Sequence, residues 1–302
     1  MTLAEAITME LDNTKLDATD TTHKNRARQY LNIVAVKVAN LQEWWWSKKT
    51  TTFKTTLQLT VTSASGAFTV GETITGGTSG TTAVLDSHDA TNGYLYVYSE
   101  SAAFTATETI TGGTSSKTCT FRSSTETRLY SPISAQVSAW YSFYDRTNGD
   151  RIDIIDPDAG DLYDGEQDET GDLAGVVIEG LDDTTGYPVI QLYPAPSTTN
   201  ETVQVRYRQD IAAWSSSNDA TELSVLGIPR LLEHGIVEGA TALHRSEKGD
   251  VEGAAEARNA LSTAVELLQE QNVLMQGNQR YMPRNGHDEY AINIGTSLAT
   301  QG

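Results

Sequence analysis

The residues best suited to chemistry lie in one strongly acidic segment between Asp145 and Asp183. It holds 14 Asp or Glu side chains against Arg146 and Arg151, and so contributes −12 of the formal net charge of −19. Carboxylates at such density can bind calcium or act in general acid catalysis. Five of the aspartates are closely spaced: Asp153, Asp156, Asp158, Asp161 and Asp164.

Neither chemistry finds the pattern that it requires. A twelve-residue calcium loop needs acidic first, third and fifth positions, a glycine at the sixth and a closing glutamate, and no register of this segment supplies them. General acid catalysis needs a carboxyl group whose pKa is raised in an apolar pocket, and a high density of carboxylates does not provide one. We therefore predict no metal site, and a solvated loop is the simplest interpretation of this segment.

A glycine-rich stretch and five histidines are the other residues that could take part in catalysis. The stretch from Gly76 to Gly80 (GGTSG) suggests a phosphate-binding loop, but it lacks the Lys-Ser/Thr pair and lies in a β-hairpin context. The histidines show no metal-ligand spacing, and no nucleophile elbow is present. They are His23, His88, His234, His244 and His287. We predict no catalytic residues, no cofactor and no enzymatic activity.

Composition restricts the class of protein. A chain of 302 residues is long enough for about two domains. Cys119 is the single cysteine, so no disulfide can form within one chain. No apolar run approaches the ~18 residues of a membrane span, and residues 1–25 lack a signal-peptide core. The sequence pI near 4.5 argues against gripping nucleic acid by its phosphates; the acidity either repels DNA from a channel wall or simply keeps the protein soluble.

Residues 2–46 predict two helices. A short apolar stripe in residues 3–11 is followed by a longer one at helical spacing: Ala27, Tyr30, Leu31, Val34, Val38, Leu41 and Trp45. Trp44, Trp45 and Trp46 close the second helix. Adjacent helical residues point about 100° apart, so three large rings cannot all face one core. Some must reach another helix or a neighbouring subunit, unless all three pack locally in an irregular hinge.

An internal repeat marks an insertion at residues 62–126. The sequence from Ala67 to Ser79 returns as Ala103 to Ser115, an offset of 36 residues, and each copy predicts a Thr-rich hairpin with a Gly-Gly-Thr-Ser turn. Two copies are too few for a solenoid, so we predict a small β-barrel or sandwich. Tyr94, Tyr96 and Tyr98 share one face of a strand. That face is either a binding platform for a fibre, capsid protein or glycan, or a solvated or inter-sheet face.

The remaining elements follow in order. Residues 131–144 predict a short helix bearing Val137, Trp140, Tyr141 and Tyr144. Residues 189–193 and 202–208 alternate as two strands joined by a Pro-Ala-Pro turn. Residues 229–276 predict two helices that pack as an antiparallel hairpin. Beyond Gly277 the chain changes to an apolar and polar alternation that is typical of an arm ordered on binding.

The stretch from Gly186 to His244 carries a family resemblance. The string Ile-Gln-Leu-Tyr-Pro-Ala-Pro, a strand ending Val-Arg-Tyr-Arg, a polar loop with Glu-Leu, and a helix beginning near Ile-Pro-Arg-Leu-Leu-Glu-His-Gly follow one another. This order resembles the head-to-tail adaptor (connector) proteins of tailed bacteriophages, including the rings called tail tubular protein A. The resemblance covers roughly residues 1–60 and 127–276.

The resemblance implies a homo-oligomeric ring of twelve copies. It implies contact with the portal protein on one side and with a tail nozzle or tail tube protein, or tail fibres, on the other. Genomic DNA would pass through without specific binding, and no membrane is involved. Assembly would occur in the host cytoplasm, and the protein would reside at the head–tail interface of the virion.

The resemblance also assigns roles to particular residues. A C-terminal arm would reach into the portal ring through Tyr281, Met282, Arg284, Tyr290, Ile292, Ile294 and Leu298. The alternative is a frayed tail. We place the five aspartates and the three tryptophans at the DNA channel or a seam between subunits, and the three tyrosines on a peripheral face of the insert.

These observations together predict an α+β fold class. It comprises an α-helical bundle of N-terminal and C-terminal helices with a small antiparallel β-sheet, plus an inserted all-β barrel or sandwich domain. Residues 1–61 and 127–276 form the adaptor core, residues 62–126 the insert and residues 277–302 the arm. The predicted function is structural; the alternative is a virion decoration or receptor-binding protein that uses the insert.

Overall fold

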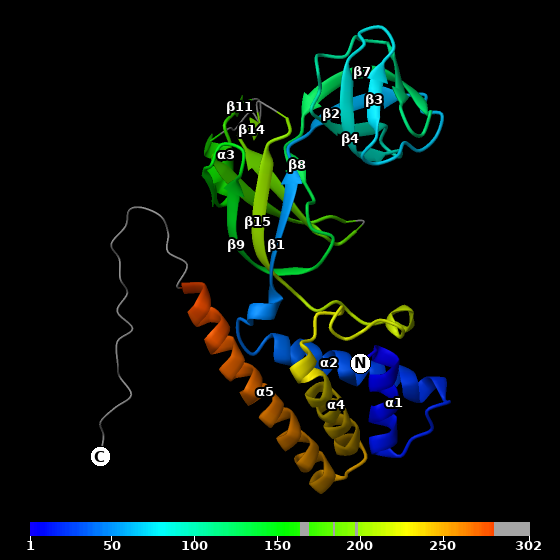
Figure 1. Cartoon of the computed structure of the whole chain (residues 1–302), viewed down its shortest axis with the longest axis vertical. Helices are drawn as coiled ribbons and strands as arrows, with labels where there is room; N and C mark the ends of the chain where they lie inside the picture. Colours follow the sequence, from blue (N-terminus) through cyan, green and yellow to red (C-terminus); the bar gives the residue numbers. More distant parts are fainter. Residues whose placement is uncertain (164–168, 184, 197–198, 281–302) are drawn as a thin grey trace, which may run out of the picture.

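The computed structural model describes residues 1–163, 169–183, 185–196 and 199–280. The molecule is elongated and has three tiers: helices at one end, a seven-stranded sheet in the middle and a closed β-barrel at the other end (Figure 1). Each tier has a separate cluster of buried apolar side chains. The apolar core is therefore divided in three along the long axis.

The helical tier contains α1 (Leu3–Thr14), α2 (Thr21–Ala39), α4 (Glu233–Glu247) and α5 (Val251–Arg280), with the 3₁₀ turns η1 (Trp45–Ser47), η2 (Ser216–Asn218) and η3 (Arg230–Leu232). The central sheet has the order β1 (Lys48–Lys54), β15 (Thr202–Gln209), β9 (Val137–Asp145), β10 (Arg151–Ile154), β12 (Gly175–Leu181), β13 (Pro188–Tyr193) and β8 (Leu129–Tyr130).

The barrel closes in the order β2 (Leu57–Thr62), β5 (Tyr94–Tyr98), β4 (Thr82–Asp89), β3 (Thr73–Gly76), β6 (Thr109–Gly112) and β7 (Thr118–Glu126). A helix, α3 (Pro157–Tyr163), and a two-stranded sheet of β11 (Thr170–Gly171) and β14 (Ala195–Pro196) flank the central sheet.

The predicted fold class was wrong. The described residues form fifteen strands in three sheets, so the molecule is mostly β and is not a helical bundle with a small antiparallel sheet. One cause is the acidic segment, which was interpreted as a loop. It contains β10, α3, β11 and β12, and the pairing of β10 with β12 is parallel.

A β-bulge explains a second error. Residues 131–144 were predicted as a helix, because Val137, Trp140, Tyr141 and Tyr144 recur at helical spacing. They belong to β9, where the pairing with β15 skips Tyr141. The extra residue turns Trp140 back to the side of Phe143, and their rings lie 5.4 Å apart in the sheet core. The bulge thus imitates a helical period.

In the helical tier, α4 lies between α2 and α5, and two glycines allow the close approach. A Cβ at Gly235 would lie 2.6 Å from the Cβ of Ala264, and one at Gly239 would lie 2.7 Å from Cγ1 of Val34. Helix α2 ends at Ala39, before the predicted end at Trp46. Its apolar stripe packs on α4 in the core of this tier.

In the barrel, each repeat holds the turn of the other through a buried glutamate. Glu108 Oε2 accepts hydrogen bonds from the backbone N–H groups of Thr78 and Ser79, both at 2.9 Å. Glu72 Oε2 accepts from Thr114 and Ser115 at 2.9 and 2.8 Å. The two repeats are therefore related by a pseudo-twofold axis, and the glutamate of each one binds the turn of the other. We call this pair of interactions the glutamate clamp.

The glutamate clamp also explains the glycines and excludes the phosphate loop. A Cβ on Gly76 would lie 2.6 Å from Glu108 Oε2, and one on Gly112 would lie 2.6 Å from Glu72 Oε1. In the GGTSG turn, the N–H groups of Thr78 and Ser79 point at a carboxylate of the same chain. A phosphate would have to displace that carboxylate.

The barrel joins the central sheet through a short hydrogen-bonded neck. Tyr130 Oη accepts the backbone N–H of Thr56 at 3.2 Å and donates to the carbonyl of Thr127 at 2.9 Å. The Thr127 N–H donates to the carbonyl of Thr56 at 3.2 Å. Burial raises the pKa of Tyr130 to about 12, so this hydroxyl stays protonated. The entering and leaving chains are therefore fastened side by side.

We predict that Glu108→Gln lowers the free energy of unfolding of the barrel by about 2 kcal/mol, the size of a hydrogen bond to a charged group. Oε1 of Glu108 also accepts hydrogen bonds from the Thr105 N–H at 2.6 Å and from the Ser79 hydroxyl. A glutamine has one acceptor oxygen, so it can replace only one of the two carboxylate oxygens. Urea unfolding measures the change. Glu126→Gln, an exposed glutamate on β7, is the control.

The same clamp predicts loss of stability in acid. Burial raises the pKa of Glu72 and Glu108, but their hydrogen bonds outweigh it and hold both below the ordinary 4.5. A carboxyl group whose pKa is lower in the folded state than in the unfolded state stabilises the fold at any pH above its unfolded pKa. That stabilisation is lost as the pH falls through the folded pKa. An identical acid transition in wild type and the Glu72→Gln/Glu108→Gln variant would contradict this assignment.

Candidate assembly surfaces

The predicted aspartates that the structure describes lie on β10, on α3 or in the segment that joins them. Asp153 is on β10 and Asp158 on α3, and Asp156 lies between them. Asp161 falls on α3, whereas Asp164 lies outside the described residues. Asp153 lies 3.5 Å from Arg151 Nε, and both side chains are more than 70 % exposed, so this pair is weak. Their predicted place at a channel or seam stays a prediction.

The described residues offer little to metal or catalytic chemistry. Within them, no group of three or more His, Cys, Asp or Glu side chains could hold a metal ion. Burial raises the pKa of Cys119 to about 11, so its thiol is protonated in the barrel core. Buried His244 lies 2.9 Å from Glu10 and 5.3 Å from the Tyr30 ring. These three side chains hold α1, α2 and α4 together.

The tryptophans lie at the waist, where the helical tier meets the sheet. Trp44 is fully buried, stacks on Trp46 at 6.3 Å and donates its Nε1–H to the carbonyl of Val38. Trp45 and Trp46 are half-buried. Trp44 therefore belongs to the core of its own chain, and contact of the other two with a neighbouring subunit stays a prediction.

Asn272 of α5 joins this cluster to the last helix. Its Oδ1 accepts the Trp45 N–H at 2.8 Å, and its Nδ2 donates to the carbonyl of Glu43 at 3.0 Å. The side chain is 6 % exposed. One amide therefore satisfies two backbone groups of the waist and fixes α5 against the start of β1.

The tyrosine face lies on the outside of the barrel. Tyr94, Tyr96 and Tyr98 are half-buried on β5, and the intervening Leu95 and Val97 fill the barrel core. Lys54 Nζ lies 4.3 Å from the centroid of the Tyr98 ring, so that end of the face contacts the neck. A partner could reach Tyr94 and Tyr96. The proposed arm, from Tyr281 to Leu298, lies outside the described residues.

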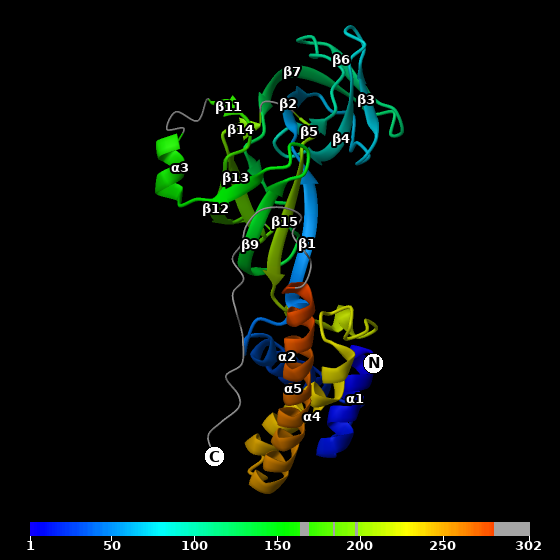
Figure 2. The ribbon, with the colours of Figure 1, turned by 60° about the vertical axis from the view of Figure 1, so that its left-hand side comes forward.

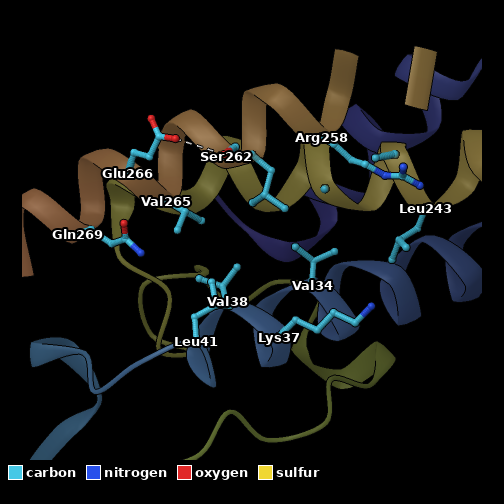
Figure 3. A pocket seen from close by; sticks show the side chains of 13 residues that line it. Val34, Lys37, Val38, Leu41, Leu243, Arg258, Ser262, Val265, Glu266 and Gln269 are labelled. Carbon is cyan, nitrogen blue, oxygen red and sulfur yellow. Dashed lines mark hydrogen bonds between the residues drawn. The ribbon is translucent and has the colours of Figure 1, made fainter. Parts of the chain in front are cut away.

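Sequence reasoning missed an apolar groove of about 450 Å³ between α2, α4 and α5 (Figure 3). Val34 and Val38 of α2 face Val265 of α5 across it. Leu41 closes one end and is 60 % exposed. Gly239 is the available signal, because a glycine inside an apolar stripe marks a place where neighbouring helices come close. Here the nearest side chains are Val34 of α2 and Leu261 of α5, which both line the groove. The groove can take an apolar side chain of a partner.

Comparison with known families gives one result that covers most of the chain. A family model described as SU10 adaptor protein matches residues 1–286. No curated protein is similar enough in sequence to add to it. None of the helices in the described ranges combines the length and apolar composition of a membrane span.

We predict that Asn272→Ala lowers the free energy of unfolding by about 1–3 kcal/mol, because it leaves a partly buried Trp45 N–H and a Glu43 carbonyl without this partner. Unfolding in urea, followed by the fluorescence of the adjacent tryptophans, measures the loss. Gln271→Ala is the matched control, since Gln271 is the exposed neighbour on α5. Equal midpoints for the two variants would show that Asn272 does not hold the waist.

Proposed function

Because the chain belongs to the SU10 adaptor protein family, and is thus a structural adaptor protein of a bacteriophage virion, we propose that it forms the head-to-tail adaptor ring. The ring lies between portal and tail and surrounds the path of the DNA. The family match over residues 1–286 is the observation that carries this proposal.

The architecture supports a spacer of this kind. The helical and barrel tiers lie at opposite ends of an elongated chain, so one copy can contact different partners at its two ends (Figure 1). The waist and the neck are each fixed by hydrogen bonds to buried side chains. A formal net charge of −19 suits a channel wall along which DNA slides without being held.

The finer assignments follow from the resemblance to tail tubular protein A. Twelve copies would form the ring in the host cytoplasm, and residues 277–302 would reach into the portal. A tail nozzle or tail tube protein, or tail fibres, would bind the other side. The groove between α2, α4 and α5 is a place for an apolar side chain of a neighbour or of the portal.

A decoration or receptor-binding role is the second candidate. It is favoured by one observation, the tyrosine face on the outside of the barrel, because Tyr combines a large contact area with a polar tip. In that case the barrel would be essential for function and the helices would only attach it.

We predict that rings form without the barrel. Residues 57–126 can be replaced by two glycines, because Thr56 and Thr127 are already hydrogen-bonded to each other. Deletion of residues 63–124 alone would leave β2 and part of β7 unpaired, with apolar side chains exposed. Mass photometry and negative-stain imaging, with and without the phage's portal protein, would count the copies in each particle.

Full-length protein and the barrel deletion should both give rings, alone or on the portal. Compact monomers or trimers of the full-length chain, with affinity for a glycan, would instead establish the second candidate. Rings of the full-length chain that disappear on deletion would place the barrel in the assembly interface.

A further inference from the structure

The outer face of the central sheet is basic, although the chain as a whole is strongly acidic. In the antiparallel pair of β1 and β15, Lys48 lies opposite Arg208 and Thr50 opposite Arg206. Directly paired residues share a face, and alternate residues return to it. The other face of β15 carries Val203 and Val205, which are fully buried in the sheet core. The charged side chains therefore point away from that core.

Two further strands extend this surface. Arg146, just after β9, donates its Nε–H to Gln204 of β15 at 3.0 Å, and Arg151 of β10 pairs with Tyr144 of β9. We call the resulting surface the basic face. It gathers six of the 21 Lys and Arg residues of the chain: Lys48, Lys54, Arg146, Arg151, Arg206 and Arg208.

Aromatic rings, more than carboxylates, surround these cations. Lys48 Nζ lies 5.3 Å from the Tyr141 ring, and the Arg146 guanidinium lies 4.6 Å from the Tyr144 ring. The carboxylate contacts are weak: Lys48 to Glu43 at 3.6 Å and the exposed Arg151–Asp153 pair. Among the described residues, exposed Arg206 has no ion-pair partner. Arg146 and Arg206, both exposed, are therefore available to a partner.

The opposite side of the same tier is acidic. Strand β1 is one edge of the sheet, whereas α3 packs on β12 toward the other edge. Both views of the ribbon place α3 and β1 on opposite sides (Figures 1 and 2). Exposed carboxylates lie on the α3 side: Asp156 and Asp158 at α3, and Asp172 between β11 and β12. We call this surface the acidic side.

We propose that the basic face of one copy docks on the acidic side of the next copy in the ring. This inference rests on the proposed adaptor function. Two different surfaces that fit each other make a head-to-tail contact, and such a contact closes into a ring when its rotation closes. Both surfaces belong to the middle tier, so copies with parallel long axes present them at the same height. DNA is the other polyanion that could bind the face, but a net charge of −19 repels it.

Charge reversal in a mixing experiment tests the contact. Arg146→Glu/Arg206→Glu reverses the basic face, and Asp158→Lys/Asp172→Lys reverses the acidic side; all four side chains are exposed. Each variant alone should need at least about tenfold more protein to form rings at moderate salt. An equimolar mixture should restore them, because each reversed surface then finds its complement on a neighbour. Native mass spectrometry should show equal numbers of the two variants in each ring.

Lys49→Glu is the matched control, because Lys49 pairs with Tyr207 and so belongs to the opposite face of β1. Circular dichroism checks that each variant folds. Rings from either reversed variant at wild-type concentration, or a mixture that stays unassembled, would overturn the proposal. So would a basic-face variant that keeps its rings but loses binding of a 30-base-pair duplex. Failure of wild type to form rings with portal would instead remove the adaptor function itself.

Discussion

The apolar core is divided into three separate clusters, and this division determines how the rest of the structure must be held together. Hydrophobic burial stabilises each tier but does not fix one tier against the next, because the clusters do not merge. The junctions are held by polar side chains that satisfy backbone groups in confined places. Asn272 does this at the waist and Tyr130 at the neck. These directional bonds fasten each tier to the next.

The sequence predicts local features well where one periodicity dominates. The 36-residue repeat and its alternating apolar positions can be recognised in the sequence, and they predict strands. The glutamate clamp is not, because Glu72 and Glu108 each bond to the turn of the other repeat, more than 25 residues away. The helix prediction for residues 131–144 was wrong because the β-bulge at Tyr141 places Trp140 on the same side of the sheet as Phe143, three residues away, as a helix would. Such an irregularity depends on the partner strand and leaves no local signal.

Long-range pairing hid the candidate surfaces for the same reason. Lys48 and Arg208 are 160 positions apart, and only the register of β1 with β15 places them on one face. The acidic segment was recognised by its composition, but its strands and helix were not. In the groove, Gly239 is needed because Val34 and Leu261, on two different helices, lie too close for a side chain at this position. Composition revealed the total charge, whereas the fold decides where each sign lies.

The separation of charge connects the fold to its role in the virion. A strongly acidic protein avoids holding DNA, yet a ring also needs copies that attract each other in spite of their like net charge. In the proposed ring, the basic face and the acidic side of the middle tier would meet both demands. The most direct measurement is a symmetry-averaged electron cryomicroscopy map of the head–tail junction of the intact virion. We expect a closed ring of this chain around the DNA, with its helical and barrel tiers at different heights. Isolated copies on the capsid surface, away from the portal, would contradict the account.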